Sequence, residues 1–134
     1  MKALIIIAHG SRREEANDEI KQLARYLAEN DQSDFDYITH SFLEMGQPDI
    51  PKTVNEVIQS NAAADGATSA TQIVILPYFL AAGAHVARDI PGIIEDLKVI
   101  HPTVTFSIMP HIGSTEGMKR LLSMQIQQAS FRKD

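Results

Sequence analysis

Apolar residues gather in four short runs along the chain, and longer segments with a mixed apolar and polar pattern separate these runs. Residues 3–8 are continuously apolar and rich in isoleucine, which is typical of a strand buried on both faces of a sheet. Residues 37–43, 73–76 and 104–109 form the other runs. The pattern predicts four β-strands.

A helix is predicted after each run, because apolar residues return there at spacings of three and four. These residues are Ile20, Leu23, Ala24 and Leu27; Ile50, Val54, Val57 and Ile58; Ile90, Ile93, Ile94 and Leu97; and Met118, Leu121, Leu122 and Ile126. Asp49 and Asp89 each stand two residues before a proline, which predicts helix starts at residues 50 and 90. His101, followed by a proline, predicts the end of the third helix.

The predicted order of elements is βαβαβαβα over a single domain, residues 1–134. This order predicts an α/β fold in which a four-stranded parallel sheet is flanked by helices. The pattern does not specify the order of the strands. Because such sheets bind ligands at the carboxyl ends of their strands, the residues that follow each strand are the candidates for function.

The composition narrows the classes of function. Hydrophobic residues make up 44% of the chain and charged residues 22%, as in a folded globular domain. A net charge of −5 argues against nucleic acid and anionic membranes as partners. The chain has no cysteine, which excludes disulfides, thiolate metal sites and cysteine nucleophiles. The apolar run at the N-terminus is too short for a signal peptide or a membrane span, so we expect a cytoplasmic protein.

Histidines stand at or near the ends of the predicted strands. These are His9, His40, His85 and His111, whereas His101 lies at the opposite end of a helix. Small residues flank His9 and His85, and we expect these two rings to share a site. The sequence lacks the glycine-rich loops that cradle nucleotide phosphates, and it lacks the G-x-S-x-G motif of hydrolases.

Two neutral imidazoles with one carboxylate would suit a divalent ion such as Fe²⁺, Co²⁺, Ni²⁺ or Zn²⁺. Phe79 and Leu80 would add an apolar wall, which favours a flat, bulky ligand that receives the ion. Histidine phosphatase chemistry at His9 stays open as an alternative, with Arg12 and Arg13 as phosphate ligands. Those enzymes usually carry an arginine directly before this histidine, where the present chain has an alanine.

Three motifs occur in order along the chain: HGSR at residues 9–12, FLE at residues 42–44 followed by a proline, and PYFLAAGAHVARDIP at residues 77–91. Together they resemble the short class II tetrapyrrole chelatases of the CbiX/SirB type. The resemblance implies a single chelatase domain with a flavodoxin-like sheet. It implies a lyase that inserts a divalent metal, Co²⁺ ahead of Fe²⁺ or Ni²⁺, into sirohydrochlorin for cobalamin or sirohaem synthesis. The metal would be a substrate, no organic cofactor is implied, and the half-length chain would form a homodimer.

The resemblance also assigns residues. His9 and His85 would bind the metal, His9 would accept a proton, and Glu44 would handle protons and substrate. The macrocycle would lie against a loop formed by Phe79, Leu80, Ala81, Ala82, Gly83 and Ala84. Its carboxylates would meet Arg12, Arg13 or Arg88. Two departures are His111, an extra polar group, and Ala82, where some relatives carry a further histidine. A non-catalytic carrier of metal or tetrapyrrole is the remaining alternative.

Overall fold

The computed structural model describes residues 1–31, 33–65 and 70–130, and all of their side chains except those of residues 63–65, 84–86 and 130. Strands and helices alternate as predicted. The elements are β1 (Lys2–Gly10), α1 (Glu14–Asn30), β2 (Tyr37–Met45), α2 (Ile50–Asp65), β3 (Gln72–Pro77), α3 (Ala84–Ile100), β4 (Thr105–Ile108), the 3₁₀ helix η1 (Ile112–Ser114) and α4 (Glu116–Ser130).

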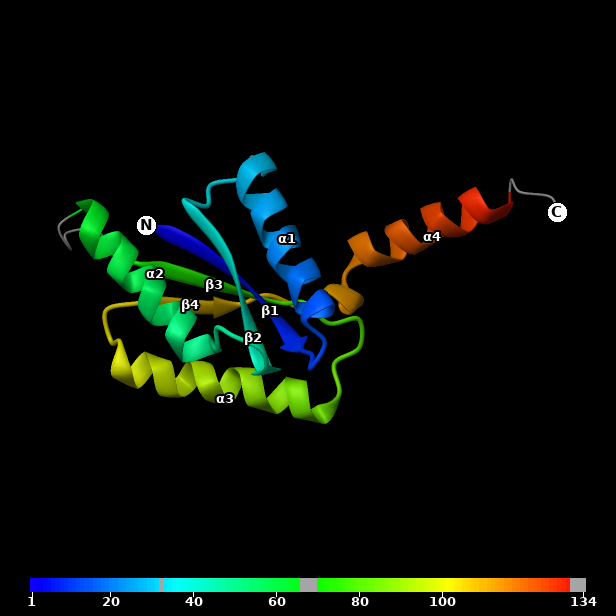
Figure 1. The fold of residues 1–134 in the computed structure, drawn as a ribbon. Helices are drawn as coiled ribbons and strands as arrows, with labels where there is room; N and C mark the ends of the chain where they lie inside the picture. Colours follow the sequence, from blue (N-terminus) through cyan, green and yellow to red (C-terminus); the bar gives the residue numbers. More distant parts are fainter. Residues whose placement is uncertain (32, 66–69, 131–134) are drawn as a thin grey trace.

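The four strands form one parallel sheet in the order β2-β1-β3-β4. The predicted fold class is therefore confirmed, and the strand order is new information. β1 is central and is hydrogen-bonded on both edges, to β2 and to β3. Parallel pairing brings the carboxyl ends of β1, β2 and β3 to one edge of the sheet, where His9 and the loop before α3 lie (Figure 1).

The two faces of the sheet are covered unequally (Figure 1). Helices α2 and α3 pack on one face, over a core of buried residues. That core comprises Ala3, Ile5, Ile7, Ile50, Val54, Val57, Ile73, Ile75, Ile90, Ile94, Leu97 and Phe106. Helix α1 packs on the other face against β1 and β2, over Leu4, Ile6 and Ala24. Helix α4 extends away from the sheet instead of packing on it (Figure 1).

The predicted start of the third helix was wrong. Residue 50 does begin α2, and the Asp49 carboxylate accepts a hydrogen bond from the Lys52 amide at 2.9 Å. Residue 90, however, lies inside α3, which begins at Ala84 with Gly83 as its N-cap and continues through Pro91. The Asp-Ile-Pro pattern imitates a helix start, yet α3 continues through Pro91, although an interior proline removes one backbone hydrogen bond and its ring crowds the carbonyl one turn earlier. His101 is the C-cap of α3, as predicted.

Two further bounds differ in a way that matters for the site. β1 runs to Gly10 and β2 to Met45, so His9 and Glu44 belong to strands and not to the loops after them. Ala84 and His85 belong to the first turn of α3. Among the described residues, no helix is long and apolar enough to cross a membrane.

We expect Ile5→Ala in β1 to lower the free energy of unfolding by about 2–5 kcal/mol, because this fully buried side chain would leave a cavity in the centre of the core. Urea unfolding followed by circular dichroism measures the change. Val99→Ala is the control, since Val99 is 82% exposed on α3, and it should cost less than about 0.5 kcal/mol. Equal losses in the two variants would contradict this description of the core.

Candidate functional site

His9 and Glu44 lie side by side at the carboxyl edge of the sheet. His9 Nε2 is 3.5 Å from Glu44 Oε2, and both side chains are part-exposed. His9 Nδ1 lies 3.3 Å from the Gly10 carbonyl oxygen. Both ring nitrogens therefore face oxygen acceptors, and the ring can take a second proton while each N–H keeps a partner.

An irregularity in the β1–β2 ladder creates this pair. Ala8 is paired with Phe42, whereas Gly10 is paired with Met45, so one residue of β1 stands opposite two residues of β2. Such a bulge re-aims side chains at the end of a strand. Here it sets Glu44 beside His9.

Phe79 forms the apolar side of the site. Its ring contacts His9 edge to face, with 6.5 Å between ring centroids and 85° between ring planes. Phe79 itself is anchored against the main core. The candidate site thus joins three side chains from the ends of three adjacent strands: an imidazole, a carboxylate and an aromatic ring.

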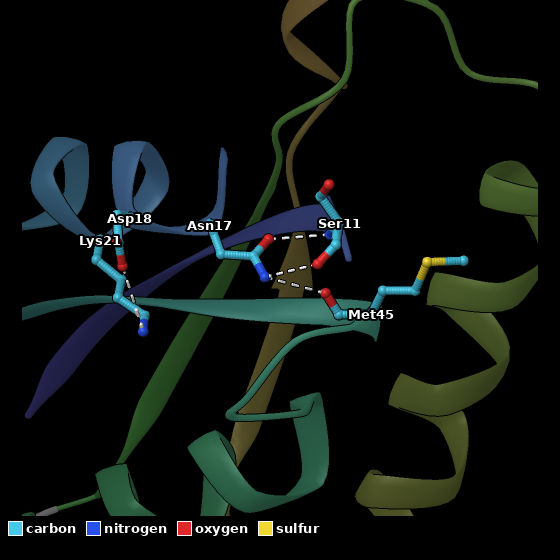
Figure 2. Close-up of polar contacts among 5 residues, drawn as sticks. All are labelled: Ser11, Asn17, Asp18, Lys21 and Met45. Atoms are coloured by element: carbon cyan, nitrogen blue, oxygen red, sulfur yellow. Dashed lines mark hydrogen bonds and ion pairs between the residues drawn. The ribbon is translucent and has the colours of Figure 1, made fainter. Parts of the chain in front are cut away.

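Asn17 fastens the β1–α1 loop to the end of β2 (Figure 2). Its side-chain oxygen accepts a hydrogen bond from the Ser11 amide at 2.9 Å. Its amide group donates to the Ser11 carbonyl at 2.9 Å and to the Met45 carbonyl at 3.2 Å. Asn17 is only 5% exposed, so its side of these part-buried bonds is shielded from water, and the bonds hold the two strand ends in one arrangement.

Gly10 makes this close approach possible. Its φ is +94°, and a Cβ atom at this position would lie 2.6 Å from the Met45 carbonyl oxygen. Any other residue would push β1 and β2 apart next to His9.

The 3₁₀ helix η1 contacts and supports the loop between β3 and α3. The Gly113 amide donates to the Phe79 carbonyl at 2.9 Å. A Cβ atom on Gly113 would lie 1.5 Å from the Leu80 carbonyl oxygen, so only glycine fits against this loop. The loop in turn presents Leu80, which is 72% exposed, followed by exposed small residues at positions 81–83.

His85 and Ala84 were both predicted to belong to the site, and their side chains lie outside the described residues. The backbone places both in the first turn of α3, directly after the exposed loop. The convergence of His9 and His85 therefore stays a prediction. Among the described side chains, no three histidine, aspartate or glutamate groups come together as a metal site.

The predicted arginines lie on two sides of the site. Arg12 and Arg13 are exposed in the loop between β1 and α1. Arg88 lies on α3 and lines a cavity of about 510 Å³ together with Glu44. Arg88 is the only cation in this lining as described, which otherwise carries the acidic residues Glu44, Asp89 and Asp96.

The remaining histidines fall in three different places. His40 pairs with Ile6 and so faces α1, away from His9; its pKa is lowered by burial and, to a smaller extent, by the nearby Lys21. His111 precedes η1 and lines a second cavity of about 430 Å³, which also contains Ala82. His101 caps α3 at the opposite edge of the sheet. Of these three, only His111 lies beside the predicted loop.

Asn17 and Gly113 were not predicted from the sequence. Asn17 did carry a signal, because it occupies a position three residues before Ile20 in the apolar stripe of α1, where a polar residue needs a buried partner. Gly113 carried none, since its role depends on contact with a loop distant in sequence.

Comparison with known proteins adds an independent finding. A model of the CbiX family matches residues 3–129. The sirohydrochlorin cobaltochelatase of Methanosarcina acetivorans is 34% identical over 133 residues, a match that covers 94% of this chain and 95% of that protein. The sirohydrochlorin cobaltochelatase of Methanococcus aeolicus is 35% identical over 94 residues, which cover 70% of this chain. That match covers 59% of the M. aeolicus protein, so this chain spans less than two thirds of its length.

A solved structure shares the fold. The crystal structure of a CbiX protein of cobalamin biosynthesis from Marinobacter aquaeolei VT8 superposes with a TM-score of 0.77 at 23% identity. The match covers 99% of this chain and 100% of that one.

We expect Asn17→Ala to lower the free energy of unfolding by about 1–3 kcal/mol, because part-buried backbone groups of Ser11 and Met45 lose their partner. Chemical denaturation measures the loss. Asn30→Ala is the matched control at the other end of α1, where the exposed amide donates only to the Tyr26 carbonyl, and it should change stability by less than about 0.5 kcal/mol. An Asn17→Ala variant with an unchanged free energy of unfolding would show that the Asn17 hydrogen bonds do not hold the two strand ends together.

We expect Gly113→Ala and Gly92→Ala to have opposite effects. The first forces backbone apart at Leu80 and should lower the thermal midpoint by several degrees, on the order of 1 kcal/mol or more. The second adds a methyl group to α3 with nothing within 4 Å and should raise stability by about 0.4–1 kcal/mol. Differential scanning calorimetry tests both predictions. A Gly113→Ala variant more stable than the wild type would show that close contact at Gly113 does not support the loop.

Proposed function

Because this chain belongs to the CbiX family, we propose that it is a sirohydrochlorin chelatase, a lyase-class enzyme that inserts a divalent metal ion into the macrocycle. Relatives matched over almost the whole chain are sirohydrochlorin cobaltochelatases, which favours Co²⁺ as the metal and cobalamin as the product's destination. Fe²⁺ and Ni²⁺ accept the same nitrogen ligands, so sirohaem synthesis is the second destination to test.

The observation that carries the proposal is the His9–Glu44 pair beside the Phe79 ring. Insertion exchanges two pyrrole N–H protons for one M²⁺, so the site has to accept protons and present the ion. A neutral His9 would bind the ion or take a pyrrole proton through Nε2, and Glu44 at 3.5 Å would receive that proton or stabilise the imidazolium. His85, the other predicted metal ligand, would supply the second imidazole from the first turn of α3.

A flat pigment needs an apolar platform and cations at its rim. The exposed Leu80 and the small residues Ala81, Ala82 and Gly83 would let a ring approach the backbone, with Phe79 behind His9. Ala84 would continue the same surface into α3. Arg88 is well placed for a substrate carboxylate, because it lines the cavity that also holds Glu44. Arg12 and Arg13 would serve the same purpose from the β1–α1 loop.

The proposal includes a setting for the enzyme. We infer a cytoplasmic homodimer, in which each copy supplies one half of a cleft for the tetrapyrrole. The substrate is a small molecule, and neither nucleic acid nor a membrane is required.

We expect His9→Ala and His85→Ala each to lower the single-turnover rate of Co²⁺ insertion by about 100- to 10,000-fold, toward the spontaneous rate, because each removes an imidazole that binds the ion or takes a proton. The change in the visible spectrum of sirohydrochlorin measures insertion. His101→Ala, at the opposite edge of the sheet, should keep the wild-type rate.

Other outcomes separate the alternatives. Wild-type rates in both variants would refute the proposed site. Tight binding of pigment or metal without acceleration would indicate a carrier, and turnover of a phosphomonoester with a phosphohistidine at His9 would indicate a phosphatase.

A further inference from the structure

The cavity that contains His111, called the His111 cavity below, lies between α3 and the carboxyl end of β4 and measures about 430 Å³. Its walls are almost entirely apolar, and they include Ala87, Ile90, Pro91, Ile108 and Met109. Among the side chains that the structure describes, His111 is the only titratable group in this lining. Apolar walls with one polar group are typical of a pocket that binds and orients a small molecule.

The His111 cavity adjoins the loop that forms the apolar side of the candidate site. Ala82 lines the cavity and belongs to the exposed stretch at positions 81–83. His111 is the N-cap of η1, and the Gly113 amide of η1 donates to the Phe79 carbonyl at 2.9 Å. The cavity and the candidate site therefore share the loop between β3 and α3.

The backbone of His111 is fixed, whereas its ring is available. The His111 carbonyl accepts hydrogen bonds from the Ser114 amide at 3.0 Å and from the Ser114 hydroxyl at 2.8 Å. The ring is half-buried and makes no hydrogen bond or ion pair with any other described residue. A side chain on a fixed backbone loses little freedom when a ligand binds it, so His111 is suited to hold a polar group of a ligand.

The distance across the sheet suits one particular ligand geometry. β4 lies two strands away from β1, the strand that carries His9. Neighbouring strands are about 4.8 Å apart, so the end of β4 lies roughly 10 Å from the end of β1. This span is comparable to that between the centre of a tetrapyrrole and the carboxylates on its rim. A macrocycle centred beside His9 would therefore reach the His111 cavity with its rim.

We propose that the His111 cavity is a substrate subsite that holds one corner of the tetrapyrrole, and that His111 binds the carboxylate of that corner. The apolar walls would contact the pyrrole edge and its methylene groups. This inference rests on the proposed function and adds a specificity-determining residue to it. A site built to bind a polar group rejects analogues that lack the group, so His111 would favour macrocycles with a carboxylate at this corner.

The first test compares two variants of His111. We expect His111→Leu to raise the dissociation constant of metal-free sirohydrochlorin and its KM in Co²⁺ insertion about tenfold, with kcat within about twofold, because a hydrogen bond to a charged group is lost. His111→Lys keeps a cationic donor and should stay within about threefold of the wild type. Sirohydrochlorin fluorescence measures binding. His101→Leu, at the opposite edge of the sheet, is the matched control and should change neither constant.

Each other outcome has a defined meaning. Equal losses in His111→Leu and His111→Lys would show a packing role at η1, and a lower kcat with unchanged KM would place His111 in the chemistry; both overturn the subsite. Unchanged affinity in His111→Leu would also overturn it. A wild-type protein that binds sirohydrochlorin without accelerating insertion would refute the proposed function alone, since the dissociation constants still report on His111. A wild-type protein that does not bind sirohydrochlorin would refute both.

The second test fills the cavity from α3 and holds even if His111→Leu fails to fold. Ala87 is exposed and lines the cavity, so Ala87→Phe would occupy the space of the macrocycle corner. We expect the dissociation constant of sirohydrochlorin to rise about tenfold or more. Val99→Phe is the matched control near the other end of α3, where the side chain is 82% exposed, and it should leave binding unchanged. Equal affinities of the two variants would overturn the subsite.

Discussion

The central strand β1 is hydrogen-bonded along both edges and packed on both faces, and every other feature of the molecule depends on this confinement. Residues 3–8 are all buried, so the strand cannot shift in register without exposing isoleucines to water. Its last residues are therefore held at a fixed height relative to β2 and β3. The position of His9 is therefore fixed by this strand, and Glu44 and Phe79 lie beside His9.

The candidate site owes its geometry to backbone contacts more than to charge. Gly10 admits the Met45 carbonyl, Asn17 fastens the loop after β1, and Gly113 lets η1 pack against the Phe79–Leu80 loop. None of these three needs to touch a ligand. They hold in place the groups that would touch a ligand. Such fixed positioning is expected where a planar macrocycle must meet an imidazole at a set distance.

Helix α4 contrasts with the confined strand. The first three helices bury apolar faces on the sheet, whereas α4 begins at a hydrogen-bonded junction that directs it outward. A monomer built this way leaves both a helix and half of a sheet face exposed.

The fold class could be predicted from the sequence. The spacing of apolar residues such as Ile5, Ile7, Val54 and Ile94 indicates the alternation of buried strands and amphipathic helices. The chemistry of the site was partly predictable too, since His9, Glu44 and Phe79 each follow from a strand end or from a motif. Tertiary structure alone decided the strand order, the bulge that sets Glu44 beside His9, and the early start of α3, where an Asp-Ile-Pro pattern was misread as a cap. It also decided the roles of Asn17 and Gly113 and the outward path of α4. The physical reason is the same throughout: local pattern reports which residues prefer burial, but register, close backbone approach and the direction of a helix depend on atoms that are distant in sequence and meet only in the folded chain.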